Sequence, residues 1–205
     1  IRLSLVGSEM CIRDSPRSLS LKAFRAPLSV VAQACLVALL ANGNAWSQAN
    51  TVNTAAGQFT AKSGNASLVG GLNNGQTVIR LESNKSVLEW ARLNVAQGNS
   101  LQFIQPNQQS VVLNRVTGSD ATRIDGSLLS NGHVWLLNPS GVLFGTKSSV
   151  NVQSLLATTR AISDADFLTN KLHFSGGGSG QVSNAGVIAV GEGGYVVLSA
   201  QSVEN

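Results

Sequence analysis

Short runs of β-favouring residues, separated by corners rich in Gly, Asn and Ser, recur between Gln76 and Ala200. Their starts are commonly about ten residues apart, which is the rhythm of all-β folds rather than of helices. We predict strands over residues 76–81, 100–105, 110–116, 123–129, 132–138, 142–144, 150–152, 171–174, 181–182, 187–190 and 195–200. A sandwich, a barrel and a β-solenoid all fit this rhythm.

The clearest corner is the four-residue sequence Asn138-Pro139-Ser140-Gly141. Pro presets φ at about −65° and Gly tolerates positive φ, so these residues predict a tight turn, with the Asn138 side chain bonded to the backbone two residues on. The turn separates two short apolar runs, and we expect four of their side chains to face the core: Val134, Leu136, Val142 and Phe144.

This stretch resembles the N-terminal secretion domain of filamentous haemagglutinin-like exoproteins, the two-partner-secretion or haemagglutination-activity domain. In that family a strand ends in Asn-Pro-Asn-Gly and is followed by an aliphatic strand and Phe-Gly; here Ser140 replaces the second Asn. Similar motifs flank it in the same order, at residues 103–107, 113–118, 123–126, 162–167 and 193–196. The resemblance covers roughly residues 49–205, and it implies a right-handed parallel β-helix (a solenoid) with N-terminal cap strands.

Two segments break the strand rhythm. Residues 88–93 read as a helical turn or a strand, and the family resemblance implies a strand with Trp90 near the N-terminal cap. Farther on, Ser163 suits an N-cap, and Asp164 and Asp166 suit a first helical turn, so we expect a short helical excursion from the solenoid. The two carboxylates are also candidate Ca²⁺ ligands, but Ca²⁺ takes about 6–8 oxygens and the sequence offers no cluster around them.

The first 15 residues do not read as natural protein sequence. Read back into codons, residues 10–15 (Met-Cys-Ile-Arg-Asp-Ser) fit the end of a common transposon-based sequencing adapter, and the residues before them fit the rest. We interpret residues 1–15 as an assembly artefact, with a natural N-terminal extension as the alternative.

Residues 16–49 have the organisation of a secretory signal peptide. Arg17, Lys22 and Arg25 form a basic n-region, and residues 28–41 form an apolar h-region. The apolar run is shorter than the ~20 residues that a membrane-spanning helix needs. We therefore predict cleavage after Ala45 or Ala49 and a mature domain over residues 50–205.

Charge and cysteine content narrow the function of that domain. The chain has a formal net charge of +4, but residues 50–205 carry nine Lys or Arg and eight Asp or Glu. These charges are scattered, without the basic stripe of a nucleic-acid-binding protein, so we expect no nucleic-acid partner. Cys11 and Cys35 both precede the domain, so packing and backbone pairing must stabilise it without a disulfide.

Candidate catalytic groups are sparse. His133 and His173 each lie in a predicted strand, and no Gly-x-Ser-x-Gly elbow is present. Two carboxylate pairs look like corners or caps: Asp120 with Asp125, and Asp164 with Asp166. The glycine-rich residues 176–180 precede a strand, so they read as a flexible corner rather than a phosphate cradle. We predict no catalytic, cofactor or metal site; a β-helix enzyme acting on polysaccharide is the less favoured alternative.

The resemblance implies a secretion and folding module. It implies export through the periplasm of a Gram-negative bacterium, recognition there by a partner outer-membrane β-barrel transporter, and folding at the cell surface or in the medium. The implied recognition elements are two turn motifs, of which the first is degenerate: Gln105-Pro106-Asn107 and Asn138-Pro139-Ser140-Gly141.

The sequence reaches Asn205 directly after a predicted strand. Because a solenoid that ends in an open edge invites aggregation, we expect a fragment of a longer exoprotein. We expect an adhesin whose missing region binds a host-cell surface or glycan receptor, with a haemolysin or contact-dependent toxin as the alternative.

Overall fold

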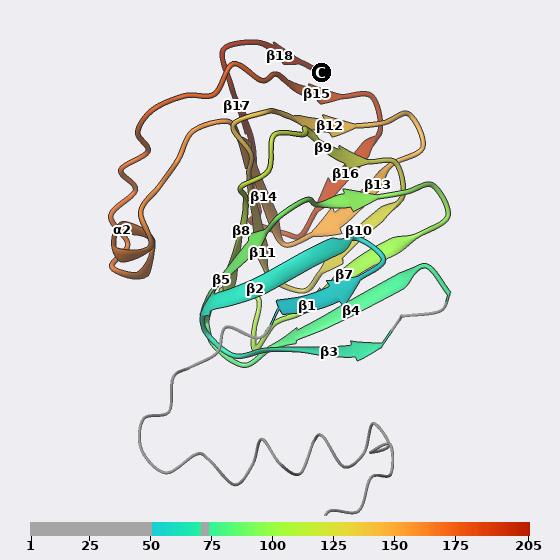
Figure 1. Cartoon of the computed structure of the whole chain (residues 1–205), viewed down its shortest axis with the longest axis vertical. Coiled ribbons are helices and arrows are strands. Elements are labelled where there is room, and N and C mark those ends of the chain that lie inside the picture. The colour runs from blue at the N-terminus through green and yellow to red at the C-terminus, as the bar shows by residue number, and fades with distance from the viewer. Residues whose placement is uncertain (1–50, 71–73) are drawn as a thin grey trace, which may run out of the picture. The chain divides into compact units, whose positions relative to one another are not determined.

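The structure is a computed structural model that describes residues 51–70 and 74–205. The predicted artefact, signal peptide and cleavage positions lie outside these residues. The described part is built almost entirely of strands, which form three sheets along one stack of coils (Figure 1).

Each sheet runs along one side of the stack. Sheet 1 consists of β1 (Thr51–Thr54), β2 (Gly57–Ser63), β5 (Lys85–Trp90), β8 (Val111–Val116), β11 (His133–Leu137), β14 (Ser154–Thr158) and β17 (Val196–Ser199). Sheet 2 consists of β3 (Ala66–Gly70), β4 (Gln76–Leu81), β7 (Ser100–Ile104), β10 (Ser127–Ser130), β13 (Ser149–Val152) and β16 (Val187–Val190). Sheet 3 consists of β6 (Asn94–Val95), β9 (Thr122–Ile124), β12 (Val142–Phe144), β15 (Val182–Asn184) and β18 (Val203–Glu204).

From β4 onward the chain visits sheet 2, sheet 1 and sheet 3 in turn, so each coil adds one strand to every sheet. Neighbouring coils pair in parallel, and equivalent positions lie side by side, as Ser100, Ser127 and Ser149 do in sheet 2. Each coil therefore offers a backbone edge to the next. The predicted parallel β-helix is confirmed, and the sandwich and barrel alternatives are wrong.

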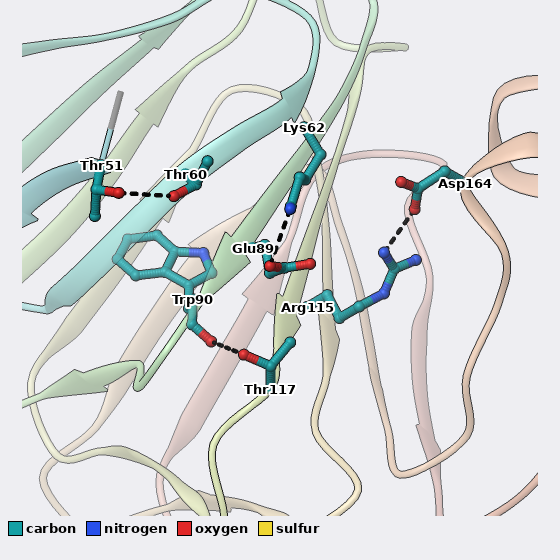
Figure 2. Close-up of polar contacts among 8 residues, drawn as sticks. All are labelled: Thr51, Thr60, Lys62, Glu89, Trp90, Arg115, Thr117 and Asp164. Carbon is teal, nitrogen blue, oxygen red and sulfur yellow. Dashed lines mark hydrogen bonds and ion pairs between the residues drawn. The ribbon is translucent and has the colours of Figure 1, made fainter. Parts of the chain in front are cut away.

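Antiparallel strands cover the N-terminal end of the stack. β1 and β2 pair antiparallel and continue antiparallel onto β5, while β3 pairs antiparallel with β4. Phe59 of β2 packs on Trp90 of β5 with 4.9 Å between ring centroids, and both side chains are buried. A hydrogen bond between the hydroxyls of Thr51 and Thr60 joins β1 to β2 (Figure 2). The predicted cap is confirmed, and Trp90 of β5 lies next to it as expected.

The core lies inside the coils, where apolar side chains from all three sheets meet. The four residues predicted to face it are each no more than 1% exposed: Val134, Leu136, Val142 and Phe144. Alternation of buried and exposed positions along the strands accounts for this, because successive side chains point to opposite faces.

Two strand predictions are wrong. Residues 123–129 form two strands, β9 and β10, with a corner at Asp125-Gly126 between them. A Cβ on Gly126 would lie 2.3 Å from the carbonyl oxygen of Asn99, so glycine is required where two coils approach at this corner. Residues 171–174 form no strand; there Phe174 packs on Trp135, with 5.9 Å between ring centroids.

The segment between β14 and β15 leaves the stack and carries α2 (Asp164–Leu168) (Figure 1). The Ser163 hydroxyl accepts the N–H of Asp166 at 3.0 Å, so the predicted N-cap and helical turn are confirmed. Phe167 of α2 is buried and packs edge-on against Trp135 on the outer face of sheet 1. The middle of sheet 1, in β5, β8, β11 and β14, therefore carries buried side chains on both faces. Within the described residues, no helix is long and apolar enough to cross a membrane.

Candidate functional site

The turn Asn138-Pro139-Ser140-Gly141 joins β11 of sheet 1 to β12 of sheet 3. Asn138 Oδ1 accepts the N–H of Ser140 at 2.9 Å, and the Asn138 carbonyl accepts the N–H of Gly141 at 2.9 Å. Gly141 has a φ of 113°, which an L-residue with a side chain rarely adopts. The predicted turn is confirmed, including the side-chain bond two residues on.

Asn138 is fully buried between coils. Its Nδ2 donates to the carbonyl of Asp120 at 2.9 Å and to the hydroxyl of Thr122 at 3.0 Å, both in the preceding coil. Its backbone N–H donates to the carbonyl of Thr158 in the following coil at 3.0 Å. A buried amide with all these partners has a structural role, and it is not free to bind another molecule in the folded domain.

The exposed part of this turn is Pro139, and Ser140 is half-buried. The glycine-rich residues 176–180 pass directly over it: the N–H of Gly180 donates to the Pro139 carbonyl at 3.1 Å. A Cβ on Gly178 would lie 1.8 Å from that same carbonyl oxygen. These glycines allow two backbone segments to lie in contact. The predicted flexible corner is therefore a packed one.

The first motif, Gln105-Pro106-Asn107, joins β7 of sheet 2 to β8 of sheet 1. Gln105 is buried, and its Nε2 donates to the Ser130 hydroxyl at 2.9 Å and to the His133 carbonyl at 3.0 Å. Pro106 and Asn107 are exposed. The two motifs thus share one design, in which a buried amide side chain shapes the corner and a proline is exposed beside it.

The structure does not bring the two motifs together. In the parallel sheet 1, the first motif precedes β8, whereas the second follows β11, so they lie at opposite ends of the strands. Five residues of strand span about 16 Å at ~3.3 Å per residue. A partner segment that binds both motifs must therefore extend along the full length of the strands of sheet 1, and a shorter segment can bind only one motif.

Two basic side chains that the sequence analysis did not select fix the excursion to sheet 1. Arg115 of β8 points toward Asp164 (Figure 2); its Nη1 lies 2.6 Å from Asp164 Oδ1, and its Nη2 donates to the Ile162 carbonyl at 2.7 Å. The contact with Asp164 is an ion pair rather than a well-aligned hydrogen bond. Lys85 of β5 donates to the carbonyls of Phe167 and Leu168, and burial lowers its pKa. Nothing in the sequence signals contacts across such separations.

Some of the candidate catalytic residues have other contacts, whereas Asp120 is exposed and Asp166 is half-buried. Asp125 forms an ion pair with Arg123 at 3.2 Å, and Asp164 forms the ion pair with Arg115 described above. His133 lies in β11 against the ring of Tyr195, and burial lowers its pKa. His173 is exposed in the excursion rather than in a strand, which corrects the prediction. Throughout residues 51–70 and 74–205, no three His, Cys, Asp or Glu side chains group as metal ligands would.

A parallel β-helix with an antiparallel N-terminal cap, a buried Asn-Pro corner and a docked excursion defines a capped β-helical domain. The chain belongs to the TPS secretion domain family, which it matches over residues 48–205. It is the N-terminal secretion domain of a two-partner-secreted exoprotein, a class exported through the periplasm to the surface or medium of Gram-negative bacteria. The family implies an outer-membrane transporter as partner.

Two curated relatives are heme/hemopexin-binding proteins of Haemophilus influenzae. One is 36% identical over 97 residues, covering 47% of this chain and 10% of the relative. The other, from strain ATCC 51907 / DSM 11121 / KW20 / Rd, is 41% identical over 73 residues, covering 36% and 8%. The match thus spans a tenth or less of either relative's length.

A solved structure supports the same family. The crystal structure of the HMW1 secretion domain from Haemophilus influenzae is similar to this chain with a TM-score of 0.60 and 29% sequence identity. The similarity covers 64% of this chain and 36% of that chain.

Proposed function

We propose that the transporter recognises this domain in the periplasm through its Asn-Pro-type corners. The observation that carries the proposal is that the residues of the second turn have two different roles. Asn138 and Gly141 are buried and shape the backbone, whereas Pro139 is exposed beside them. In the first motif Gln105 shapes the corner, and Pro106 and Asn107 are the exposed contact candidates.

We also propose that the domain nucleates the β-helix of the exoprotein. The N-terminal strands cover the first coil, whereas one side of β16, β17 and β18 in the last coil pairs with no strand of the described residues. That coil carries partly exposed apolar side chains at inward positions, with Val196 42% and Val203 44% exposed. A further coil would pair with these strands and bury these side chains.

The effector function, in our proposal, belongs to other parts of the exoprotein. An adhesin that binds a host-cell surface or glycan receptor is the first candidate, and a haemolysin or contact-dependent toxin is the alternative. The names of the curated relatives add a heme- or hemopexin-binding exoprotein as a further candidate. The domain itself is proposed to be a secretion module rather than an enzyme, because one carboxylate of each candidate pair, Asp125 and Asp164, is paired with an arginine.

The domain limits are proposed as an artefact over residues 1–15, a signal peptide over 16–49 and the secretion domain over 50–205. N-terminal sequencing of exported material is expected to begin at Trp46 or Asn50. Exported protein that retains the apolar residues 28–40 would exclude a cleaved signal peptide.

The recognition proposal is tested by Pro139→Ala and Asn138→Ala, expressed with the cognate transporter. Pro139 is exposed, so Pro139→Ala is expected to alter stability by only about 0.4–1 kcal/mol but to reduce export strongly. Asn138→Ala leaves buried hydrogen-bonding groups without partners and is expected to cost about 1–3 kcal/mol, with a loss of export as well.

Export is measured as protein in the medium, and stability as thermal melting of the chain recovered from the periplasm. Pro106→Ala changes the same residue type at the other corner and shows which motif the transporter reads. Wild-type export of both proline variants would leave the corners with a structural role alone.

A further inference from the structure

A cleft of about 350 Å³ lies beside Pro139, where β8 and β11 leave sheet 1. Its walls come from the end of β8, from the turn after β11 and from the chain directly after β14. Leu137, Pro139 and Ala161 form apolar parts of the wall, and Arg115 and Arg160 bring two guanidinium groups to it. The cleft is thus mainly apolar with a basic rim.

The two arginines differ in their partners. The Arg115 guanidinium already has two, because it pairs with Asp164 and donates to the Ile162 carbonyl. Arg160 is exposed, and its Nη1 makes only a long contact of 3.5 Å with the Gly176 carbonyl. Among residues 51–70 and 74–205, the ion pairs do not include Arg160. Arg160 also lines a second hollow of about 310 Å³, so its charge borders two recesses.

The lining restricts what the cleft can accept. No carboxylate of the described residues lines it, which disfavours a cation. No aromatic ring of these residues lines it either, which leaves a sugar without a stacking surface. Its volume is at the low end of the ~300–1,000 Å³ of small-molecule sites, which suits one or two side chains of a protein partner. A free guanidinium at an apolar recess favours a carboxylate, which it binds bidentately.

We propose that this cleft receives an anchor segment of the outer-membrane transporter, which requires the coils that contain β8, β11 and β14 to fold in the periplasm rather than only at the cell surface. An apolar side chain of the transporter inserts against Leu137, Pro139 and Ala161, and a neighbouring carboxylate pairs with Arg160. The inference rests on the proposed function, since Pro139 belongs both to the recognition turn and to the cleft wall. It adds the chemistry of the partner, an acidic and apolar segment, and it names Arg160 as a binding residue. Buried apolar anchors and arginines supply most of the binding energy at many interfaces.

The test measures binding of the exported chain, which is expected to begin at Trp46 or Asn50, recovered from the periplasm of cells without the transporter. The probe is the purified periplasmic region of the cognate transporter. Arg160→Glu is expected to raise Kd by at least about tenfold, because it places a carboxylate opposite a carboxylate. Ala161→Phe, which fills the cleft, is expected to have a similar effect. Arg160→Lys keeps the charge but loses the bidentate geometry, so it should fall between wild type and Arg160→Glu.

Lys147→Glu is the matched control. Lys147 is exposed at the corner after β12, so this substitution makes the same charge change away from the cleft. It is expected to leave Kd within about threefold of wild type, as for a screened distant charge. Added salt should weaken wild-type binding more steeply than binding of Arg160→Ala.

Wild-type affinity in both Arg160→Glu and Ala161→Phe would overturn this inference and leave the proposed function standing. Absence of any binding by the wild-type chain would instead overturn the proposed function, and this inference with it. If Arg160→Glu lowers the melting temperature, charge reversal of acidic residues in the transporter region provides the second measurement. Binding that is recovered when Arg160→Glu meets a charge-reversed transporter variant supports the contact. If charge reversal at each acidic residue of the transporter region fails to recover binding, the contact is rejected.

Discussion

The ammonium nitrogen of Lys85 lies 2.6 Å from the carbonyl oxygen of Phe167, although the two residues are 82 positions apart in the chain. The same nitrogen lies 2.6 Å from Asn170 Oδ1 and 5.3 Å from the centre of the Phe167 ring. The last carbonyls of a helix have no partner within it, and a cation there is favourable. Lys85 lies in the first coil, and it thus stabilises the C-terminal end of α2, in the excursion that leaves the fourth coil.

Lys85→Met is expected to destabilise the domain by about 1–3 kcal/mol, because charged hydrogen bonds to the excursion are lost. Urea unfolding followed by tryptophan fluorescence measures this, and Trp135 reports on the excursion directly. Lys62→Met is the control, since Lys62 forms an exposed ion pair with Glu89 worth at most about 1 kcal/mol (Figure 2). Equal losses in the two variants would show that Lys85 contributes no more than a surface charge.

Phe144→Ala is expected to cost about 3–5 kcal/mol, because it opens a cavity in the middle of the stack. Phe144 is 1% exposed and lies in the main core. The adjacent Leu143 points to the other face of β12 and is half-buried, so Leu143→Ala should cost much less. Chemical denaturation of both variants tests this; a larger loss for Leu143→Ala would contradict the assignment of the inner face.

Gly141→Ala is expected to destabilise the domain more than Gly98→Ala. Both glycines have positive φ, 113° and 81°, so each substitution incurs backbone strain of about 1–2 kcal/mol. A Cβ at Gly141 would also lie 2.6 Å from the Gln181 carbonyl oxygen, whereas one at Gly98 would meet nothing within 4 Å. Thermal melting compares them, and equal melting temperatures would mean that the Gln181 backbone moves aside freely.

The domain is expected to lose stability as the pH falls below about 6.5, in part through His133. Burial lowers the pKa of His133 from its ordinary value of 6.5, so the unfolded chain takes up this proton first as the pH falls. The contribution is fully present above pH ~6.5 and declines toward the lowered pKa of the folded state. His133→Phe should flatten the melting temperature between pH ~7 and pH ~5; an unchanged pH dependence would assign the effect to other groups.

Much of this protein was determined by local sequence alone. The Asn138 turn, the Ser163 N-cap and the inward positions of Val134 and Phe144 were all predicted and are confirmed. Each depends on neighbouring residues: a side chain that bonds the backbone two or three positions on, or the alternation of a strand. The β-helix itself needed the family resemblance, because the strand rhythm is shared with sandwiches and barrels.

Only the tertiary structure decided which faces of the coils are covered. Trp135 and Leu156 alternate with inward residues and would read as solvent-facing, yet they are 7% and 8% exposed because the excursion packs over them. Likewise, the glycines at residues 176–180 acquire their purpose only where they cross the Pro139 carbonyl. Such contacts join segments far apart in the chain, and their free energy depends on stacking of the coils rather than on local propensity. Within the part of the chain that the structure describes, Arg160 contacts no carboxylate, and only the folded positions of its neighbours reveal that its charge lies at the rim of a cleft.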